Sequence, residues 1–481
     1  MADDTLRTQP PGKRWMWAGL AAAAVYFGVA CAIISTDIIT ARAGFDDLMN
    51  HEPTIREFAR QWPRFDFTDY LSATTPGYHL LLAGVVKFVS ADRHLLQVVS
   101  ASIGAAWIGL MVALAARLAG VARGVVFVLP LAMSAYVLQS AAYLLPDDIS
   151  WLMLLVAMLL YLGKWTPGRA AAAGVATLLA VFVRQPLIWL VGVAWLAAWL
   201  SAAEPKPGRA LLRSVFVENL RTRLARTGVA IATTLPALGL MEYFAAIWHG
   251  LTVPRYQHLH EGVGVSTPVF VLANIGFSSL FFVVSLWPIV RELWQRARVS
   301  VVLVGVGAAA IGVLQPSTFD EPAGRGSGLW TLGQRLPHVG DVSLFIFGLA
   351  VVGGVALLAW LATFDTRRRL ILLAALAGFT AAQTMNKITA QRYVEPFVMM
   401  LVVLAAARCV GLCAPRLRRW LLVGPLVYAM FCIAVNLYTY KGSMLIKDYP
   451  RADAALGVEG GPYIRPEDRP KGPVSAPSLK P

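Results

Sequence analysis

Long apolar stretches recur along the chain from Trp15 to about Tyr440, and short polar links separate them. A hydrocarbon core about 30 Å thick requires roughly 20 apolar residues per helix, and no soluble domain interrupts the series. The pattern therefore predicts an all-α polytopic membrane protein with about thirteen transmembrane helices. The expected spans are residues 15–36, 95–116, 124–144, 149–163, 170–183, 186–202, 228–247, 267–290, 299–314, 342–362, 370–386, 394–412 and 420–439.

The segment between the first two spans, about residues 37–94, is unusually long and polar. Its apolar part, Pro76 to Val89, is shorter than a span, so we expect a helix that lies on the membrane surface. If this helix does not cross, almost all basic links share the side of the N-terminus, as the positive-inside bias requires. The N-terminus is then cytoplasmic and the first loop lies outside. These basic links are residues 117–123, 164–169, 206–226, 291–298, 367–369 and 416–419.

Composition supports the membrane class, with 57% hydrophobic and 14% charged residues. The net charge of +15 reflects the basic links rather than a nucleic-acid surface, because Lys and Arg lie between apolar spans. The four cysteines lie in or beside spans, so no disulfide framework is expected. We interpret residues 1–440 as one membrane domain and residues 441–481, rich in Pro and Gly, as a poorly ordered tail on the outer side.

The outer loops carry polar residues that apolar packing does not require. Each has an ordinary explanation alone: an acidic pair can cap a helix, and an arginine at a helix end can anchor it at the interface. Together, acidic pairs in early loops and cations in later ones suit transfer of a sugar from a lipid phosphate. That reaction requires a carboxylate to accept a hydroxyl proton and cations to hold the leaving phosphate. The candidates are Asp46, Asp47, His51, Asp147, Asp148, Arg184, Gln185, Arg255, His258, Arg392 and Tyr393.

Several short units resemble the eukaryotic α-1,2-glucosyltransferases that add the terminal glucose to lipid-linked oligosaccharide from dolichyl-phosphate-glucose. The resemblance spans roughly residues 40 to 397, in the family's order. Departures from the family are the Asp-Asp pair, one additional residue before His51, Pro186 in place of Thr, and a looser Asp320–Arg325 unit. The matching units are Phe45-Asp46-Asp47, His51-Glu52-Pro53, Trp62, Thr74 to Leu81, Tyr143 with Asp147-Asp148 and Ser150, Val183 to Trp189, and Gln391-Arg392-Tyr393 with Pro396.

This resemblance implies the GT-C fold and an inverting glycosyltransferase in which Asp46 is the base. It implies a polyprenyl-phosphate-linked hexose donor, with glucose favoured, and a glycan or lipid-linked acceptor. Asp47 would be a second catalytic carboxylate. His51, Tyr78, Asp147 and Asp148 would form the acceptor and sugar pocket, and Arg184, Gln185, Arg255, His258, Arg392 and Tyr393 would bind the donor phosphate.

No cofactor is expected, and no nucleic-acid partner. Asp147-Asp148 resembles an acidic unit that holds a divalent ion in some GT-C enzymes, but the interpretation favours no metal. The Arg- and Ala-rich composition favours a bacterial homologue in the inner membrane, with its active site on the periplasmic side.

The alternative is a transporter or flippase of lipid-linked glycans, which would place polar groups near the middle of its spans rather than at their outer ends. Transfer of arabinose or mannose, or transfer to protein or lipid A, also remains open. The enzymatic hypothesis requires Asp46 to lie near Arg184 and Arg392.

Overall fold

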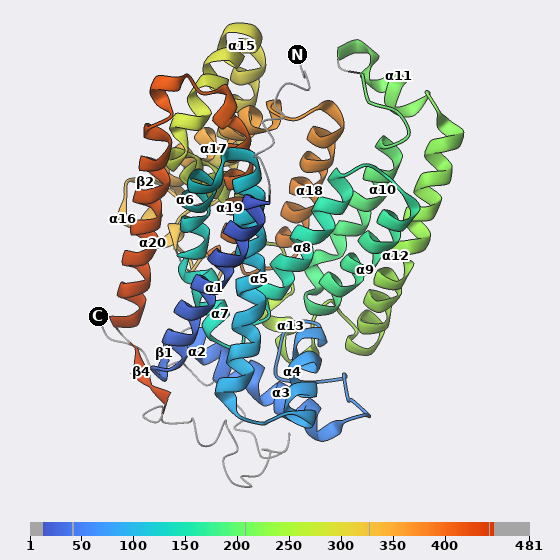
Figure 1. Ribbon diagram of the computed structural model, residues 1–481, viewed down its shortest axis with the longest axis vertical. Helices are drawn as coiled ribbons and strands as arrows, with labels where there is room; N and C mark the ends of the chain where they lie inside the picture. Colours follow the sequence, from blue (N-terminus) through green and yellow to red (C-terminus); the bar gives the residue numbers. More distant parts are fainter. Residues whose placement is uncertain (1–12, 41–42, 207, 327, 442, 447–481) are drawn as a thin grey trace.

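Helices make up most of the computed structural model, which describes residues 13–40, 43–206, 208–326, 328–441 and 443–446. Most of them run along the long axis of the molecule (Figure 1). The described chain begins at one end of this bundle, and the short helices of the first loop gather at the other end (Figure 1). The prediction of an all-α polytopic membrane protein is confirmed.

One part of the bundle is built on a long central helix, α5, which packs closely against α1. Glycines permit this approach: a Cβ on Gly19 of α1 would lie 2.6 Å from the carbonyl oxygen of Gly109. Trp107 and Met111 of α5 are completely buried. The elements here are α1 (Arg14–Ile34), α5 (Arg93–Ala119), α6 (Val121–Ala132), α7 (Ala135–Ala142), α19 (Gln391–Cys409), η5 (Val410–Leu412), η6 (Pro415–Leu417), η7 (Trp420–Leu422) and α20 (Val423–Lys441).

A second part of the bundle contains shorter helices beside the long helix α12. Gly174 of α9 allows close contact with α12, since its Cβ would lie 2.3 Å from the carbonyl oxygen of Thr233. The elements are α8 (Asp147–Leu162), α9 (Pro167–Val183), η3 (Gln185–Trp189), α10 (Leu190–Leu200), η4 (Gly208–Ala210), α11 (Leu211–Phe216), α12 (Leu220–Trp248) and α13 (Pro254–His260).

The remaining helices correct the prediction for residues 267–314. The sequence suggested spans at 267–290 and 299–314 with a link at 291–298, whereas the structure breaks at Phe282 and continues helically to a kink at Ala297. Residues 291–298 are rich in good helix formers, so the turn needs only one non-helical residue. The elements are α14 (Thr267–Phe281), α15 (Val283–Leu314), α16 (Leu329–Arg335), β2 (His338–Val339), β3 (Val342–Ser343), α17 (Leu344–Ala362) and α18 (Thr366–Thr384).

Seven helices in the described chain are long and apolar enough to cross a membrane, and the pair α6 and α7, bent by 77°, would make an eighth span. They correspond to eight of the expected spans. The other five expected spans fall on α8, α9, η3 with α10, α14 and α18, which are shorter or carry more charge. Crossing by these five remains a prediction.

The first loop folds onto one end of the bundle. Its helix α4 has 12 residues, about 18 Å of length, which is too short for a span. The strand β1 pairs antiparallel with β4, so the start of the predicted tail contacts the first loop. The rest of that tail, residues 447–481, lies outside the described residues. The loop elements are β1 (Ile38–Ile39), α2 (Ala43–Asp46), the π-helix η2 (Asp47–His51), α3 (Glu52–Gln61) and α4 (Gly77–Phe88), and the late strand is β4 (Met444–Leu445).

Candidate functional site

Asp46 and Arg392 meet although 346 residues separate them along the chain. Asp46 ends α2 in the first loop, and Arg392 lies in the first turn of α19. An Arg392 Nη1 group donates to Asp46 Oδ2, and Arg392 Nη2 donates to the Tyr393 hydroxyl over 2.9 Å. The Asp46 and Arg392 side chains retain 27% and 29% of their exposure, so both remain partly accessible from outside the protein.

A second acid–base pair lies beside the first. Arg184, directly after α9, donates to Asp147 at the start of α8 over 2.5 Å. The guanidinium groups of Arg184 and Arg392 lie 4.7 Å and 4.8 Å from the centre of the Tyr393 ring. One aromatic ring thus contacts both cations, an arrangement that cation–π attraction stabilises. Two arginines, two carboxylates and a tyrosine from four segments form this charged cluster.

Asp47 points away from this cluster, which differs from its expected catalytic role. Successive residues of a helix point about 100° apart, so adjacent carboxylates can face different surroundings. Asp47 is fully buried and pairs with Arg93 of α5, which also pairs with Glu52, while Arg56 donates to Glu52 over 2.6 Å. Burial raises the pKa of Asp47, and Arg93 opposes that shift. This buried network attaches the first loop to α5.

His51 forms a stacked pair with His79 of α4, a residue not singled out as a site candidate although it lies in the quoted Thr74 to Leu81 unit. The Nδ1 atom of His51 lies 2.9 Å from Nε2 of His79. Burial, followed by the nearby Arg392 and Arg184, lowers the pKa of His51 to about 3. Burial likewise lowers the pKa of His79. Both imidazoles are therefore neutral at pH 7, and they support the wall of the site rather than adding positive charge.

Two other candidates, Gln185 and Tyr78, form hydrogen bonds within the protein. The Gln185 amide accepts from the Thr75 backbone over 3.1 Å and donates to the Ala73 carbonyl over 2.7 Å. Tyr78 is buried, and its hydroxyl lies 3.0 Å from the Ser100 hydroxyl. Asp148 is also buried. The Gln185 contacts attach the loop before α4 to η3, and the Tyr78 contact attaches α4 to α5.

The helix α13 contributes different residues from those expected. Arg255 pairs with Asp69 over 2.8 Å, and His258 is exposed. Tyr256 instead donates to Asn50 over 2.8 Å, and Asn50 donates to Asp46 over 3.4 Å, so these two residues extend the cluster. His260 lies within electrostatic range of Arg392 and Arg184, and burial lowers its pKa. Neither Tyr256 nor Asn50 belongs to a local pattern that would single it out in the sequence.

No group of three or more His, Cys, Asp or Glu side chains suited to a metal occurs in the described part of the chain. The acidic pair Asp147-Asp148 is divided: Asp147 pairs with Arg184, and Asp148 is buried.

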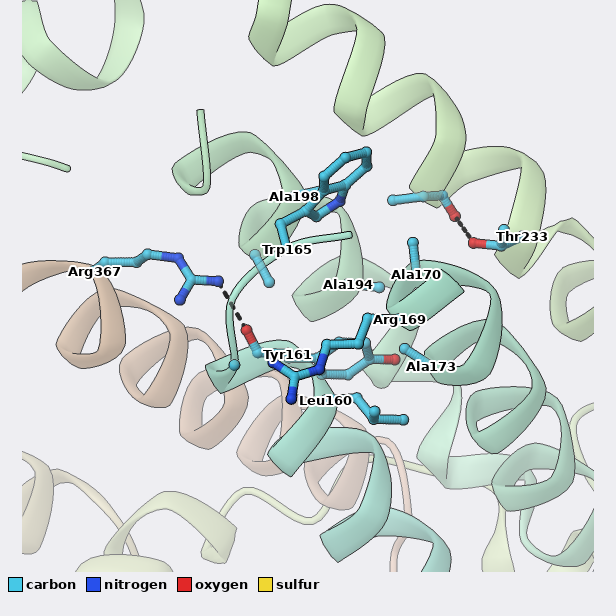
Figure 2. A pocket seen from close by; sticks show the side chains of 13 residues that line it. Leu160, Tyr161, Trp165, Arg169, Ala170, Ala173, Ala194, Ala198, Thr233 and Arg367 are labelled. Carbon is cyan, nitrogen blue, oxygen red and sulfur yellow. Dashed lines mark hydrogen bonds between the residues drawn. The ribbon is translucent and has the colours of Figure 1, made fainter. Parts of the chain in front are cut away.

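A small cavity lies at the opposite end of α9 from the cluster (Figure 2). Its volume is about 30 Å³, enough for one or two water molecules. Figure 2 shows Arg367 donating to the Tyr161 carbonyl beside Trp165 and Arg169. Since α9 separates it from Arg184, this cavity is not part of the charged cluster.

Comparison with known proteins gives distant structural similarities. No family model and no curated protein sequence matches the chain. The structure is similar to ArnT from Cupriavidus metallidurans in the apo state, with a TM-score of 0.35, 14% identity and coverage of 82% of this chain and 76% of that one. The same ArnT bound to undecaprenyl phosphate gives a TM-score of 0.34, 14% identity and coverages of 83% and 78%.

The chain is also similar to the archaeal oligosaccharyltransferase AglB from Archaeoglobus fulgidus, solved with an inhibitory peptide and a dolichol-phosphate. The TM-score is 0.39 at 16% identity, and the match covers 92% of this chain but 56% of AglB. At such scores these similarities fix neither a reaction nor a substrate for this chain.

Proposed function

We propose that this protein is an inverting GT-C-type glycosyltransferase that moves a hexose, with glucose favoured, from a polyprenyl phosphate to a glycan or lipid-linked acceptor on the outer side of the membrane. The observation that carries the proposal is the contact of Asp46 with Arg392, beside Arg184 and Tyr393. The carboxylate and the cations that the reaction requires are thereby present together at one partly exposed site.

The chemistry assigns a role to each charged group. The Asp46 carboxylate takes the proton of the acceptor hydroxyl, and that oxygen attacks the anomeric carbon from the side opposite the phosphate. The bond between the anomeric carbon and the phosphate oxygen breaks, and polyprenyl phosphate leaves with the electron pair. Arg392 and Arg184 hold the phosphate oxygens, for which planar guanidinium groups are well suited.

The positions of the cationic groups agree with a lipid-linked donor. Arg184 and Arg392 lie at the ends of apolar helices, where a phosphate at the membrane boundary would meet them while its chain stays among lipids. Ionisable groups at such depth are costly unless paired. Their pairing with Asp147 and Asp46 offsets that cost until a phosphate binds.

The direct test is turnover of radiolabelled polyprenyl-phosphate-glucose by the purified protein with a membrane extract as acceptor source. We expect Asp46→Asn to lose about a hundredfold to ten-thousandfold in rate, the range for a general base. Asp69→Asn is the matched control, because Asp69 lies on the same loop and pairs only with Arg255 in the described structure. Equal turnover by wild type and Asp46→Asn would refute the base assignment.

Arg392→Ala tests the phosphate site separately. We expect weaker donor binding, seen as a raised KM for the donor, whereas Arg60→Ala, at an exposed position on α3, should leave it unchanged. Unaltered donor affinity in Arg392→Ala would remove this residue from the phosphate site.

One observation favours the alternative of a lipid-linked-glycan transporter. Ser134 lies at the bend between α6 and α7 and donates over 2.5 Å to Glu395, a buried acid of α19. Broken helices with buried polar groups are typical of transport sites. Movement of a fluorescent lipid-linked glycan across vesicles, with no consumption of the donor by wild type, would support this alternative.

A further inference from the structure

An open cavity of about 540 Å³, a hollow in the surface rather than an enclosed void, lies at the end of the bundle where the described chain begins, far from the charged cluster. The turn between α5 and α6 forms one wall, with Ala119, Gly120 and Val121, and residues around η6 and η7 form the other. Three arginines line it: Arg123, Arg418 and Arg419. None of the lining residues is acidic.

The guanidinium groups of these arginines are not neutralised. In the described part of the chain, no carboxylate forms an ion pair with any of the three. Arg418 Nε donates to the Cys413 carbonyl over 3.3 Å, and Arg419 lies against Trp420. Most of their donors thus remain for an anion, and guanidinium forks suit phosphate oxygens. Three neighbouring cations repel one another, so an anion between them is favourable.

The surroundings identify the anion as part of a lipid. The volume is in the range of small-molecule sites and much larger than inorganic phosphate requires. Directly after Leu422, which lines the cavity, α20 exposes Val423, Leu426, Val427 and Met430, and Trp420 of η7 is exposed as well. Exposed apolar side chains next to a basic cavity match acyl chains joined to an anionic headgroup.

We propose that the cavity between the α5–α6 turn and η6–η7 binds the headgroup of an anionic phospholipid of the leaflet on that side. The three arginines contact the phosphodiester, and the acyl chains lie along α20. This site is independent of the proposed glycosyltransferase, and its occupancy can be measured without any activity.

The test is native mass spectrometry of the full-length protein, delipidated in detergent and titrated with phosphatidylglycerol or phosphatidylcholine. We expect wild type to prefer phosphatidylglycerol. Arg418→Gln with Arg419→Gln should weaken phosphatidylglycerol binding about thirtyfold and leave phosphatidylcholine binding unchanged. The matched control, Arg298→Gln with Arg416→Gln, removes two exposed charges that do not line the cavity and should change affinity by less than about threefold.

A second variant distinguishes a loss of lipid binding from misfolding of the double variant. Ala122→Glu keeps every arginine and adds a carboxylate at the cavity, in the first turn of α6, where acidic residues favour a helix. It should abolish the lipid preference and leave thermal unfolding unchanged. Equal binding of both lipids to wild type, an equal loss in the control pair, or displacement of the lipid by millimolar inorganic phosphate would each overturn the proposal.

Discussion

At the scale of single residues, the proposed function requires the ion pair of Asp46 and Arg392 to exchange partners. The Asp46 oxygen that accepts from Arg392 is occupied by that hydrogen bond, and the Arg392 nitrogen that donates to it is not free for phosphate. Both are released together if the donor phosphate takes Arg392. Asp46 would then become an effective base only after the donor binds, which protects the donor from premature hydrolysis.

Asp46→Asn should therefore bind polyprenyl phosphate more tightly than wild type, although it loses turnover. The gain should be about fivefold, since a partly exposed ion pair contributes up to about 1 kcal/mol. Isothermal titration with polyprenyl phosphate in nanodiscs measures it, and Asp69→Asn should match wild type. Weaker or equal binding by Asp46→Asn would rule out competition between the carboxylate and the phosphate.

The His51–His79 pair predicts a specific loss of stability in acid. The folded-state pKa of His51, about 3, lies below its unfolded value of about 6.5, so the unfolded chain binds a proton that the folded chain excludes. Stability is then complete above about pH 6.5 and falls as the pH drops from there toward 3. At pH 5 the loss from His51 alone is about 2 kcal/mol.

Thermal unfolding between pH 8 and pH 5 measures this loss. His51→Gln should flatten the dependence of Tm on pH, whereas His338→Gln, at an exposed position, should retain the wild-type slope. A wild-type slope in His51→Gln would show that other groups control the acid response.

At the scale of elements, the pattern of apolar residues predicted most of the helices and the short length of α4. Apolar runs and their lengths are local properties of the sequence. The sequence also placed Asp46, Arg184 and Arg392 among the candidates. The pairing of Asp47 with Arg93 and of Tyr256 with Asn50 could not be predicted, since each depends on a contact between distant segments. The π-helix that begins at Asp47 likewise has no clear sequence signal.

Close helix contacts at glycines predict where packing is most sensitive. A Cβ on Gly353 of α17 would lie 1.9 Å from the Leu272 carbonyl oxygen of α14, so Gly353→Ala forces these helices apart. We expect a loss of about 1 to 3 kcal/mol in the free energy of unfolding, seen as a lower Tm. Gly348→Ala on the same helix is the control, because nothing lies within 4 Å of its Cβ position. Equal Tm values for the two variants would contradict the close α14–α17 contact.

At the scale of the whole molecule, charge divides the bundle into two different ends. The first-loop helices lie at one end of the bundle (Figure 1), where Asp46 of α2 pairs with Arg392. The arginine cavity lies at the α5–α6 turn, at the other end. Under the two proposals made above, the chain would bind a lipid phosphate at one end and anionic phospholipid headgroups at the other.

The short helices α8 and α9 decide whether this division corresponds to the two sides of a membrane. They have 16 and 17 residues, about 24 and 26 Å of length, slightly less than the hydrocarbon thickness. Local thinning of the bilayer accommodates such a mismatch at small cost. If both helices cross the membrane, Lys164, which lies between them, is on the same side as Arg416. If neither helix crosses, Lys164 is on the side of His258.

A cysteine at each position distinguishes these arrangements. Lys164→Cys, Arg416→Cys and His258→Cys all replace exposed residues, and three of the four native cysteines are buried, so the unmodified chain provides the background. With a membrane-impermeant maleimide, we expect His258→Cys to react in intact cells and the other two to react only in inverted vesicles. Reaction of Lys164→Cys in intact cells would show that α8 and α9 do not cross. In that case the cavity of Figure 2 would share the side of the charged cluster.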